Sequence, residues 1–363
     1  MKSSTPPGWD GPDFRGRVLG GRFHLDALVG RGGTASVYAA RDRHMRRAVA
    51  IKVIHPEHTR SEEQRRRIRQ EARVGGWIEH RNVVQVLDFG EEPTEGGETI
   101  VFVVMPLVTG VTLRGLILDG ALPWRRSVDL VRQLLAGVGA IHRGGALHRD
   151  LKSNNCLVSR DDGVERLRVL DFGLAKVVRP GLISRSPGSR TGVFCGTLAY
   201  AAPEQVLGLP LDVRADLYAV GVILFELLTR RLPFTGSDYK VLRAVVETPA
   251  PSTKMLAPAA EIPAQIEAVV LRALAKDPDD RYSSADDFDR ALVEAVTLAG
   301  DVDAATLRPC PPAHLGADEA EASLAAWTCF DYEIAREQAA RASELNRAWS
   351  PLALLMSLVP DDA

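Results

Sequence analysis

The stretch HRDLKSNN, from His148 to Asn155, places an acid, a lysine and an amide close together at Asp150, Lys152 and Asn155. A carboxylate can accept the proton of a hydroxyl group, and a nearby ammonium can stabilise negative charge that develops on a reacting group. Apolar residues lie on both sides of the stretch. Charged loops between buried elements are often only solvated, so the catalytic interpretation requires matching residues elsewhere in the chain.

A second acid, Asp171, follows a strand-like run in the sequence VLDFG, sixteen residues after Asn155. An acid and an amide that converge from two loops make a hard-oxygen site, which suits Mg²⁺ and its bound phosphates. Asp150 then remains to accept a proton, and Lys152 can stabilise a phosphoryl group during transfer.

Lys52 is the one charged residue of the apolar run AVAIKV. A lysine within a buried strand is costly unless it meets an anion, and the alternative is an edge lysine that extends to water. As a phosphate ligand, Lys52 would need a carboxylate to orient it. Glu71, nineteen residues later in a helical stretch, is the candidate, because Glu62 and Glu63 at the helix start serve the helix dipole.

The turn LVGRGGTASV, residues 28–37, contains Gly30, Gly32 and Gly33 between two strand-like runs. Glycines let backbone N–H groups approach phosphate oxygens without obstruction by side chains. A dinucleotide-binding fold would need a helix directly after this turn, but the sequence continues as a strand. A hairpin over a nucleotide remains, with a simple tight turn as the alternative.

The remaining pattern predicts an α+β protein with two lobes. Residues 22–108 are mostly strand-like with one helical stretch, and residues 112–298 are mostly helical. Residues 1–20 are rich in Pro, Gly and Ser and are predicted to be a disordered arm. Residues 299–317 form a predicted linker to a helical tail, residues 318–363.

The composition of the 363 residues favours a soluble cytoplasmic protein, with 45% hydrophobic and 25% charged residues. A formal net charge of −2 gives no reason to expect nucleic acid or a membrane as a partner. The longest apolar run, residues 218–228, contains Glu226 and is too short to span a membrane. Four separated cysteines indicate reduced thiols.

Five motifs in order, GRGGTASV, VAIK, HRDLKSNN, DFG and AAPE, resemble the eukaryotic-type protein kinase family, in a form similar to bacterial serine/threonine kinases. The resemblance extends from about residue 22 to 297. It implies a small antiparallel β-rich N-lobe (21–105) with one key helix, a hinge (106–110) and a larger, mainly helical C-lobe (111–298).

The resemblance also implies roles for individual residues. Lys52, paired with Glu71, would hold the α- and β-phosphates of ATP, Asp150 would be the catalytic base, and Asn155 and Asp171 would bind Mg²⁺ or Mn²⁺. Met105 would precede the hinge, where Pro106 offers only its carbonyl to adenine. The predicted nucleotide-binding residues are Val29, Gly30, Gly32, Gly33, Val37, Ala50, Lys52, Met105, Pro106, Val108 and Leu157.

The segment from Asp171 to Glu204, ending in GTLAYAAPE, is typical of kinases that act on proteins, and small-molecule kinases of this fold typically lack it. Lys152, two residues after Asp150, favours serine/threonine specificity. Thr197 resembles the residue that ties the docking loop to Asp150 and Lys152. Glu204 is expected to pair with Arg281, and Asp216 is expected to cap the catalytic loop.

Two alternatives to a protein kinase remain. One is an ATP-binding pseudokinase scaffold, which would be favoured by the loss of Lys52, Asp150, Asn155 or Asp171, but all four are present. The other is a small-molecule kinase.

Arg149, directly before Asp150, is a cation that the resemblance matches to a phosphate on the activation segment. The hydroxyl residues of that segment include Thr191 as the first candidate and Ser189 as the second. Autophosphorylation between two chains of a dimer is the expected trigger.

Three features depart from the family pattern. Ala35 stands at the third glycine of the hairpin, and Ser153 replaces a proline and is expected to loosen the catalytic loop. Gly75 and Gly76 are expected to weaken the helix that carries Glu71.

The tail, residues 318–363, has apolar residues at helical spacing and faintly resembles one tetratricopeptide unit. A single unit cannot bury its own apolar face, so the tail is either a helical extension of the large lobe or a docking surface for a partner.

Overall fold

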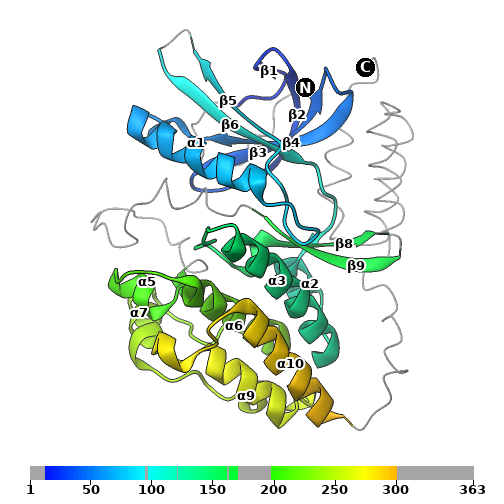
Figure 1. Cartoon of the computed structure of the whole chain (residues 1–363), viewed down its shortest axis with the longest axis vertical. Coiled ribbons are helices and arrows are strands. Elements are labelled where there is room, and N and C mark those ends of the chain that lie inside the picture. Colours follow the sequence, from blue (N-terminus) through cyan, green and yellow to red (C-terminus); the bar gives the residue numbers. More distant parts are fainter. Residues whose placement is uncertain (1–12, 95–96, 121, 162, 171–197, 301–363) are drawn as a thin grey trace.

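The computed structural model describes residues 13–94, 97–120, 122–161, 163–170 and 198–300. These residues form two lobes: an upper one built on a sheet and a lower one built mainly from helices (Figure 1). Of the helices in these residues, none is both long enough and apolar enough to cross a membrane.

The small lobe is a six-stranded antiparallel sheet with the strand order β1-β2-β3-β4-β6-β5. Its strands are β1 (Val18–Leu19), β2 (Phe23–Arg31), β3 (Ala35–Asp42), β4 (Arg47–Ile54), β5 (Asp88–Pro93) and β6 (Thr99–Pro106). The short helix η1 (Pro56–His58) follows β4, and α1 (Glu62–Trp77) packs across one face of the sheet (Figure 1).

The central strands β4 and β6 are buried along nearly their whole length, because the sheet is covered on both faces. Ile68 of α1 packs with Ile54, Val101 and Val103 on one face. A second core with Tyr38 at its centre lies on the other face. Lys52 is buried in the central strand β4, between these two layers.

The predicted disordered arm is wrong for residues 14–19. Phe14 is buried edge-on against Tyr38, with ring centroids 6.2 Å apart, and Leu19 in β1 is fully buried. These apolar side chains supply the contacts that order the segment, although Pro and Gly dominate the composition before them.

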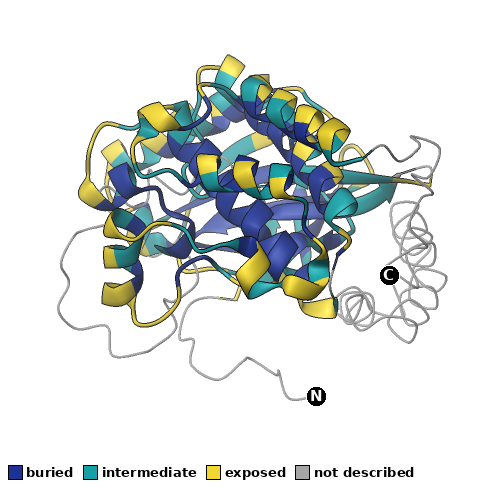
Figure 2. Cartoon of the chain, turned by 90° about the horizontal axis from the view of Figure 1, so that it is seen from below, coloured by how far each residue is buried: buried dark blue, intermediate teal, exposed yellow. Residues whose placement is uncertain are grey.

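The large lobe surrounds α6 (Val213–Thr229), a helix whose residues from Ala215 onward are all buried. A helix that is apolar on all sides needs packing partners on all sides, and the dark blue interior in Figure 2 is ringed by helices with exposed outer faces. The other elements are β7 (Val111–Thr112), α2 (Leu113–Asp119), α3 (Trp124–Arg143), η2 (Ser153–Asn155), β8 (Cys156–Asp161), β9 (Val164–Val169), η3 (Leu198–Tyr200), α5 (Pro203–Leu207), α7 (Asp238–Glu247), α8 (Thr253–Leu256), η4 (Pro258–Ala260), α9 (Ala264–Ala273), η5 (Pro278–Asp280) and α10 (Ala285–Ala299).

The α1 helix includes both Gly75 and Gly76 and ends at the next residue, Trp77, whose surface is 79% exposed. Its start is fixed by a reciprocal capping box between Ser61 and Gln64. The expected weakening by the glycines therefore falls in the last turn and leaves Glu71 within the helix.

Candidate functional site

A cavity of about 1360 Å³ lies between the two lobes. The glycine hairpin and β4 line it from the small lobe, and residues 149–155 line it from the large lobe. All eleven predicted nucleotide-binding residues lie in its wall: Val29, Gly30, Gly32, Gly33, Val37, Ala50, Lys52, Met105, Pro106, Val108 and Leu157. Asp150, Lys152 and Asn155 line the same cavity.

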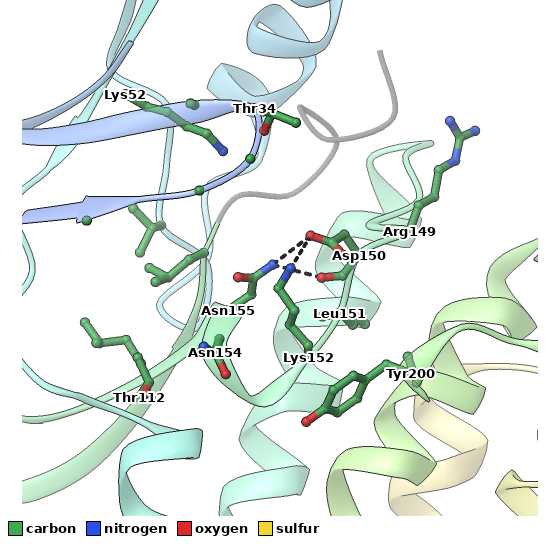
Figure 3. Close-up of a pocket in the computed structure, with 18 of the residues that line it drawn as sticks. Thr34, Lys52, Thr112, Arg149, Asp150, Leu151, Lys152, Asn154, Asn155 and Tyr200 are labelled. Atoms are coloured by element: carbon green, nitrogen blue, oxygen red, sulfur yellow. Dashed lines mark hydrogen bonds and ion pairs between the residues drawn. The ribbon is translucent and has the colours of Figure 1, made fainter. Parts of the chain in front are cut away.

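Asp150 lies at the centre of the lower wall (Figure 3). Lys152 Nζ donates a hydrogen bond to its Oδ2 at 2.8 Å, and Asn155 Nδ2 donates to its Oδ2 at 3.3 Å and to its backbone carbonyl at 2.9 Å. Both side-chain contacts involve Oδ2. The other carboxylate oxygen, Oδ1, has no protein donor among the described residues and is available to a ligand.

The chain directly before Asp150 is fixed by a buried carboxylate of α6. Asp216 accepts the backbone N–H groups of His148 at 2.8 Å and Arg149 at 2.7 Å, and His142 Nε2 lies 2.9 Å from it. Burial alone would raise the pKa of Asp216, but these hydrogen bonds and the nearby histidines hold it below the ordinary value of 3.8. The predicted cap is confirmed.

A second anchor, absent from the sequence predictions, holds the loop through Ser153. The Ser153 hydroxyl is buried 2.9 Å from the Tyr200 hydroxyl, and Tyr200 donates to Glu226 Oε2 at 2.5 Å. Arg114 pairs with the other Glu226 oxygen at 2.7 Å. Burial and the charge of Glu226 raise the pKa of Tyr200. Tyr200 therefore stays protonated, and its O–H donates a hydrogen bond to Glu226. The Ser153 hydroxyl is then the donor in its contact with Tyr200.

The expected loosening by Ser153 is therefore wrong, because the hydroxyl that replaces proline makes a buried hydrogen bond. The signal in the sequence was Glu226, an acid inside an otherwise apolar helix, which requires a buried partner.

The predicted link between Glu204 and Arg281 is confirmed as a buried two-point ion pair, with N–O distances of 2.8 and 2.9 Å. Arg281 also donates to backbone carbonyls, including that of Ala275 at 2.7 Å. Its charge is thus fully satisfied, which fixes α5 against the base of the large lobe.

Among the ion pairs that the described residues form with one another, none joins Lys52 to Glu71. Each of these two side chains does have a polar interaction. Lys52 lines the cavity and Glu71 does not, so their pairing stays a prediction. Asp171, Thr197, Ser189 and Thr191 lie outside the described residues. Leu170, next to Asp171, donates its backbone N–H to the Asn155 carbonyl at 2.8 Å.

The hinge needs a glycine at its exit. A Cβ at Gly110 would lie 2.4 Å from the carbonyl oxygen of Val158 in β8, a distance that side chains do not tolerate. The close approach of these two segments keeps Val108 and Leu157 on the same cavity wall.

Comparisons with known proteins agree with this geometry. The family model described as protein kinase domain matches residues 23–292. The serine/threonine-protein kinase PrkC of Bacillus subtilis is 33% identical over 282 residues, which cover 77% of this chain and 41% of that protein. The serine/threonine-protein kinase pkn3 of Myxococcus xanthus is 37% identical over 297 residues, covering 79% and 52%. The chain thus spans about half the length, or less, of these curated relatives.

Solved structures show the same fold. The kinase domain of Mycobacterium tuberculosis PknI has a TM-score of 0.59 and 25% identity, with 77% of this chain and 98% of that chain covered. Rad53 1–466 in complex with AMP-PNP has a TM-score of 0.60 and 27% identity, with 74% and 64% covered.

Proposed function

Because the chain belongs to the protein kinase family, we propose that it transfers the γ-phosphoryl group of ATP to serine and threonine hydroxyls of proteins. The observation that carries this proposal is the Asp150–Lys152–Asn155 cluster in the wall of a cavity that Lys52 also lines (Figure 3). Curated relatives named as serine/threonine kinases support the choice of acceptor.

In this proposal Asp150 orients the acceptor hydroxyl through its available oxygen and accepts the hydroxyl proton. Lys152 keeps the carboxylate in position and offers positive charge to the phosphoryl group as it moves. Transfer of the phosphoryl group from ATP to the hydroxyl requires little covalent chemistry from the protein. Positioning of the reacting groups therefore accounts for most of the rate enhancement.

The proposed nucleotide lies beneath the glycine hairpin with its phosphates toward Lys52. Val108 supplies an N–H and a carbonyl to adenine, and Pro106 supplies a carbonyl alone. The apolar side chains of Val37, Ala50 and Leu157, all in the cavity wall, enclose the base.

A divalent cation, Mg²⁺ or Mn²⁺, belongs to the proposal. Since Asn155 uses its Nδ2 group on Asp150, its amide oxygen remains as a hard ligand for such an ion, and Asp171 is the proposed second ligand. The ion would neutralise phosphate charge when bound.

Arg149 supports activation by phosphorylation. Its backbone has a positive φ of 67°, and its buried Nε atom has no hydrogen-bond partner among the described residues. In Figure 3 its guanidinium points away from Asp150. A cation held this way suits a phosphate. We therefore keep Thr191 or Ser189 as proposed acceptors of autophosphorylation between two chains.

The pseudokinase scaffold remains the second candidate, because nucleotide binding without transfer would use the same cavity. Three further points complete the proposal. The composition favours a cytoplasmic location, the resemblance implies a role in bacterial signalling, and the apolar spacing of residues 318–363 favours a partner protein there.

The test is the intact mass of the protein after incubation with Mg²⁺ and ATP, beside an Asp150→Asn control. Phosphate gained only by the unsubstituted protein is the expected result, with peptide mapping to locate it. If neither protein gains phosphate and neither phosphorylates a generic protein substrate, while both bind ATP, the scaffold replaces the kinase.

A further inference from the structure

A buried polar pair lies beneath the glycine hairpin and has no part in the site described so far. Ser36 in β3 and His55, directly after β4, are each 3% exposed. Ser36 Oγ lies 3.0 Å from His55 Nε2. A buried hydroxyl and a buried imidazole nitrogen both need partners, and here Ser36 Oγ and His55 Nε2 meet that need for each other.

His55 also holds the tip of the hairpin through its backbone. Its N–H donates to the carbonyl of Thr34 at 2.9 Å, and the tip itself is closed by a bond from Gly32 N–H to the Ala35 carbonyl at 2.9 Å. Gly32, Gly33 and Thr34 line the cavity. His55 therefore connects the cavity-lining turn to β4, the strand that carries Lys52. Lys52 lies three residues before His55.

The chemistry of the pair suits a neutral imidazole, which has one N–H donor and one acceptor nitrogen. Burial lowers the pKa of His55, and electrostatic repulsion from His58 and Arg31 acts in the same direction, whereas Glu57 and a backbone hydrogen bond at Gly33 oppose them. At neutral pH the imidazole is therefore uncharged.

We propose that His55 is a positioning residue that holds the glycine hairpin at its working distance above the nucleotide phosphates, through its hydrogen bond to Ser36. The inference rests on the proposed nucleotide site and deepens it. Loss of the bond frees the turn Gly32–Thr34, so its backbone N–H groups no longer form a fixed phosphate cradle, and preorganisation is lost.

A purely structural role for His55 is the alternative, and two substitutions separate the roles. The amide nitrogen of a glutamine side chain lies about as far from the backbone as the Nε2 atom of His55. The amide nitrogen of an asparagine lies about as far as the Nδ1 atom. Both remove the ring, so both lower thermal stability. Only His55→Gln can keep the bond to Ser36.

The experiment measures ADP affinity in the absence of any transfer reaction, together with KM for ATP and kcat. We expect His55→Asn and Ser36→Ala to weaken ADP binding and raise KM about 3- to 10-fold, the range of one hydrogen bond, while kcat changes less. His55→Gln should restore most of the affinity. The double variant Ser36→Ala/His55→Asn should be no weaker than His55→Asn, because both changes remove one bond.

Equal ADP affinity in the unsubstituted protein, His55→Asn and His55→Gln would overturn the inference and leave the proposed function intact. Equal loss in the two His55 variants would overturn it in favour of a structural role. An unsubstituted protein that binds no ADP would overturn both the nucleotide site and the inference.

Discussion

The glycine hairpin and the catalytic loop face the same cavity, but different contacts fasten them to the molecule. Asp216, Ser153 and the pair Glu204–Arg281 fix the catalytic loop and its surroundings through buried polar contacts to several helices. The hairpin has backbone ladders and, at its tip, the side-chain bond between Ser36 and His55. Among the described residues, a lower wall fixed by buried polar contacts between helices and loops thus faces an upper wall held mainly by backbone hydrogen bonds.

This difference suits the proposed chemistry. Proton acceptance by Asp150 requires geometry fixed to a fraction of an ångström, whereas a nucleotide must enter and leave past the hairpin in each cycle. Substitutions in the lower wall should therefore change chemistry or stability, and substitutions at the hairpin tip should change nucleotide affinity.

The largest effect is expected for Asp150→Asn. Without the proton acceptor, kcat should fall about 10²- to 10⁴-fold, while ADP affinity stays within twofold because Asp150 does not hold the nucleotide. Phosphotransfer to a protein substrate and ADP titration measure the two quantities. A variant that keeps more than a tenth of the activity would contradict the role of Asp150.

Glu204→Gln should cause the largest loss of stability. It leaves the buried guanidinium of Arg281 without its carboxylate, at a cost of about 3–5 kcal/mol in the free energy of unfolding. The matched control is Arg214→Met, which removes two partly exposed ion pairs, with Asp212 and Asp279, and should cost about 1 kcal/mol or less. Thermal melting compares the two, and equal losses would contradict the structural role of the buried pair.

A smaller effect is expected for Tyr200→Phe, which removes one hydroxyl between Ser153 and Glu226. The variant leaves a buried donor and acceptor without their shared partner, at a cost of about 1–3 kcal/mol. Because the change lies in the lower wall, kcat should fall several-fold while ADP affinity is retained. If ADP affinity fell and kcat did not, the division between the two walls would be wrong.

The smallest effect is expected from pH. The folded pKa of His55 is below 6.5, so between pH 7 and 5 the unfolded chain takes up a proton at this residue before the folded protein does. The free energy of unfolding should therefore decrease with falling pH.

Over the same range the pKa of Asp216 lies below 3.8, so its carboxylate stays ionised. The His55→Gln variant, which cannot titrate at this position, is the control for all other groups. We expect the free energy of unfolding of the unsubstituted protein to fall more steeply than that of His55→Gln between pH 7 and 5. Identical stability profiles would show that the pKa of His55 is not lowered in the folded protein.

The sequence predicted the cavity walls well because their residues are neighbours in short motifs. HRDLKSNN brings Asp150, Lys152 and Asn155 together through local geometry alone. The two distant contacts that were predicted, at Asp216 and at Glu204–Arg281, came from the family resemblance and not from the pattern of the residues.

Contacts particular to this chain were not predictable in the same way. Ser36 and His55 look like an ordinary strand residue and a residue after a strand until β3 and β4 are aligned. The ring of Phe14 finds Tyr38 only once the sheet has formed. Such pairs depend on three-dimensional register, which no local spacing encodes.

The sequence separation of the anchors has a consequence for synthesis of the protein. The hairpin bond joins residues 19 positions apart, so the small-lobe sheet can close once Pro106 has emerged from the ribosome. The lower wall needs contacts that span 68, 77 and 112 residues, the pair Glu204–Arg281 among them.

At roughly 5–20 residues per second, Arg281 emerges about 9–35 s after Pro106. During that interval a nascent chain can form the glycine hairpin before the contacts that fix the catalytic loop have formed. Under the proposed function, the contacts that fix the phosphoryl-transfer site are therefore complete only after Arg281 has been made.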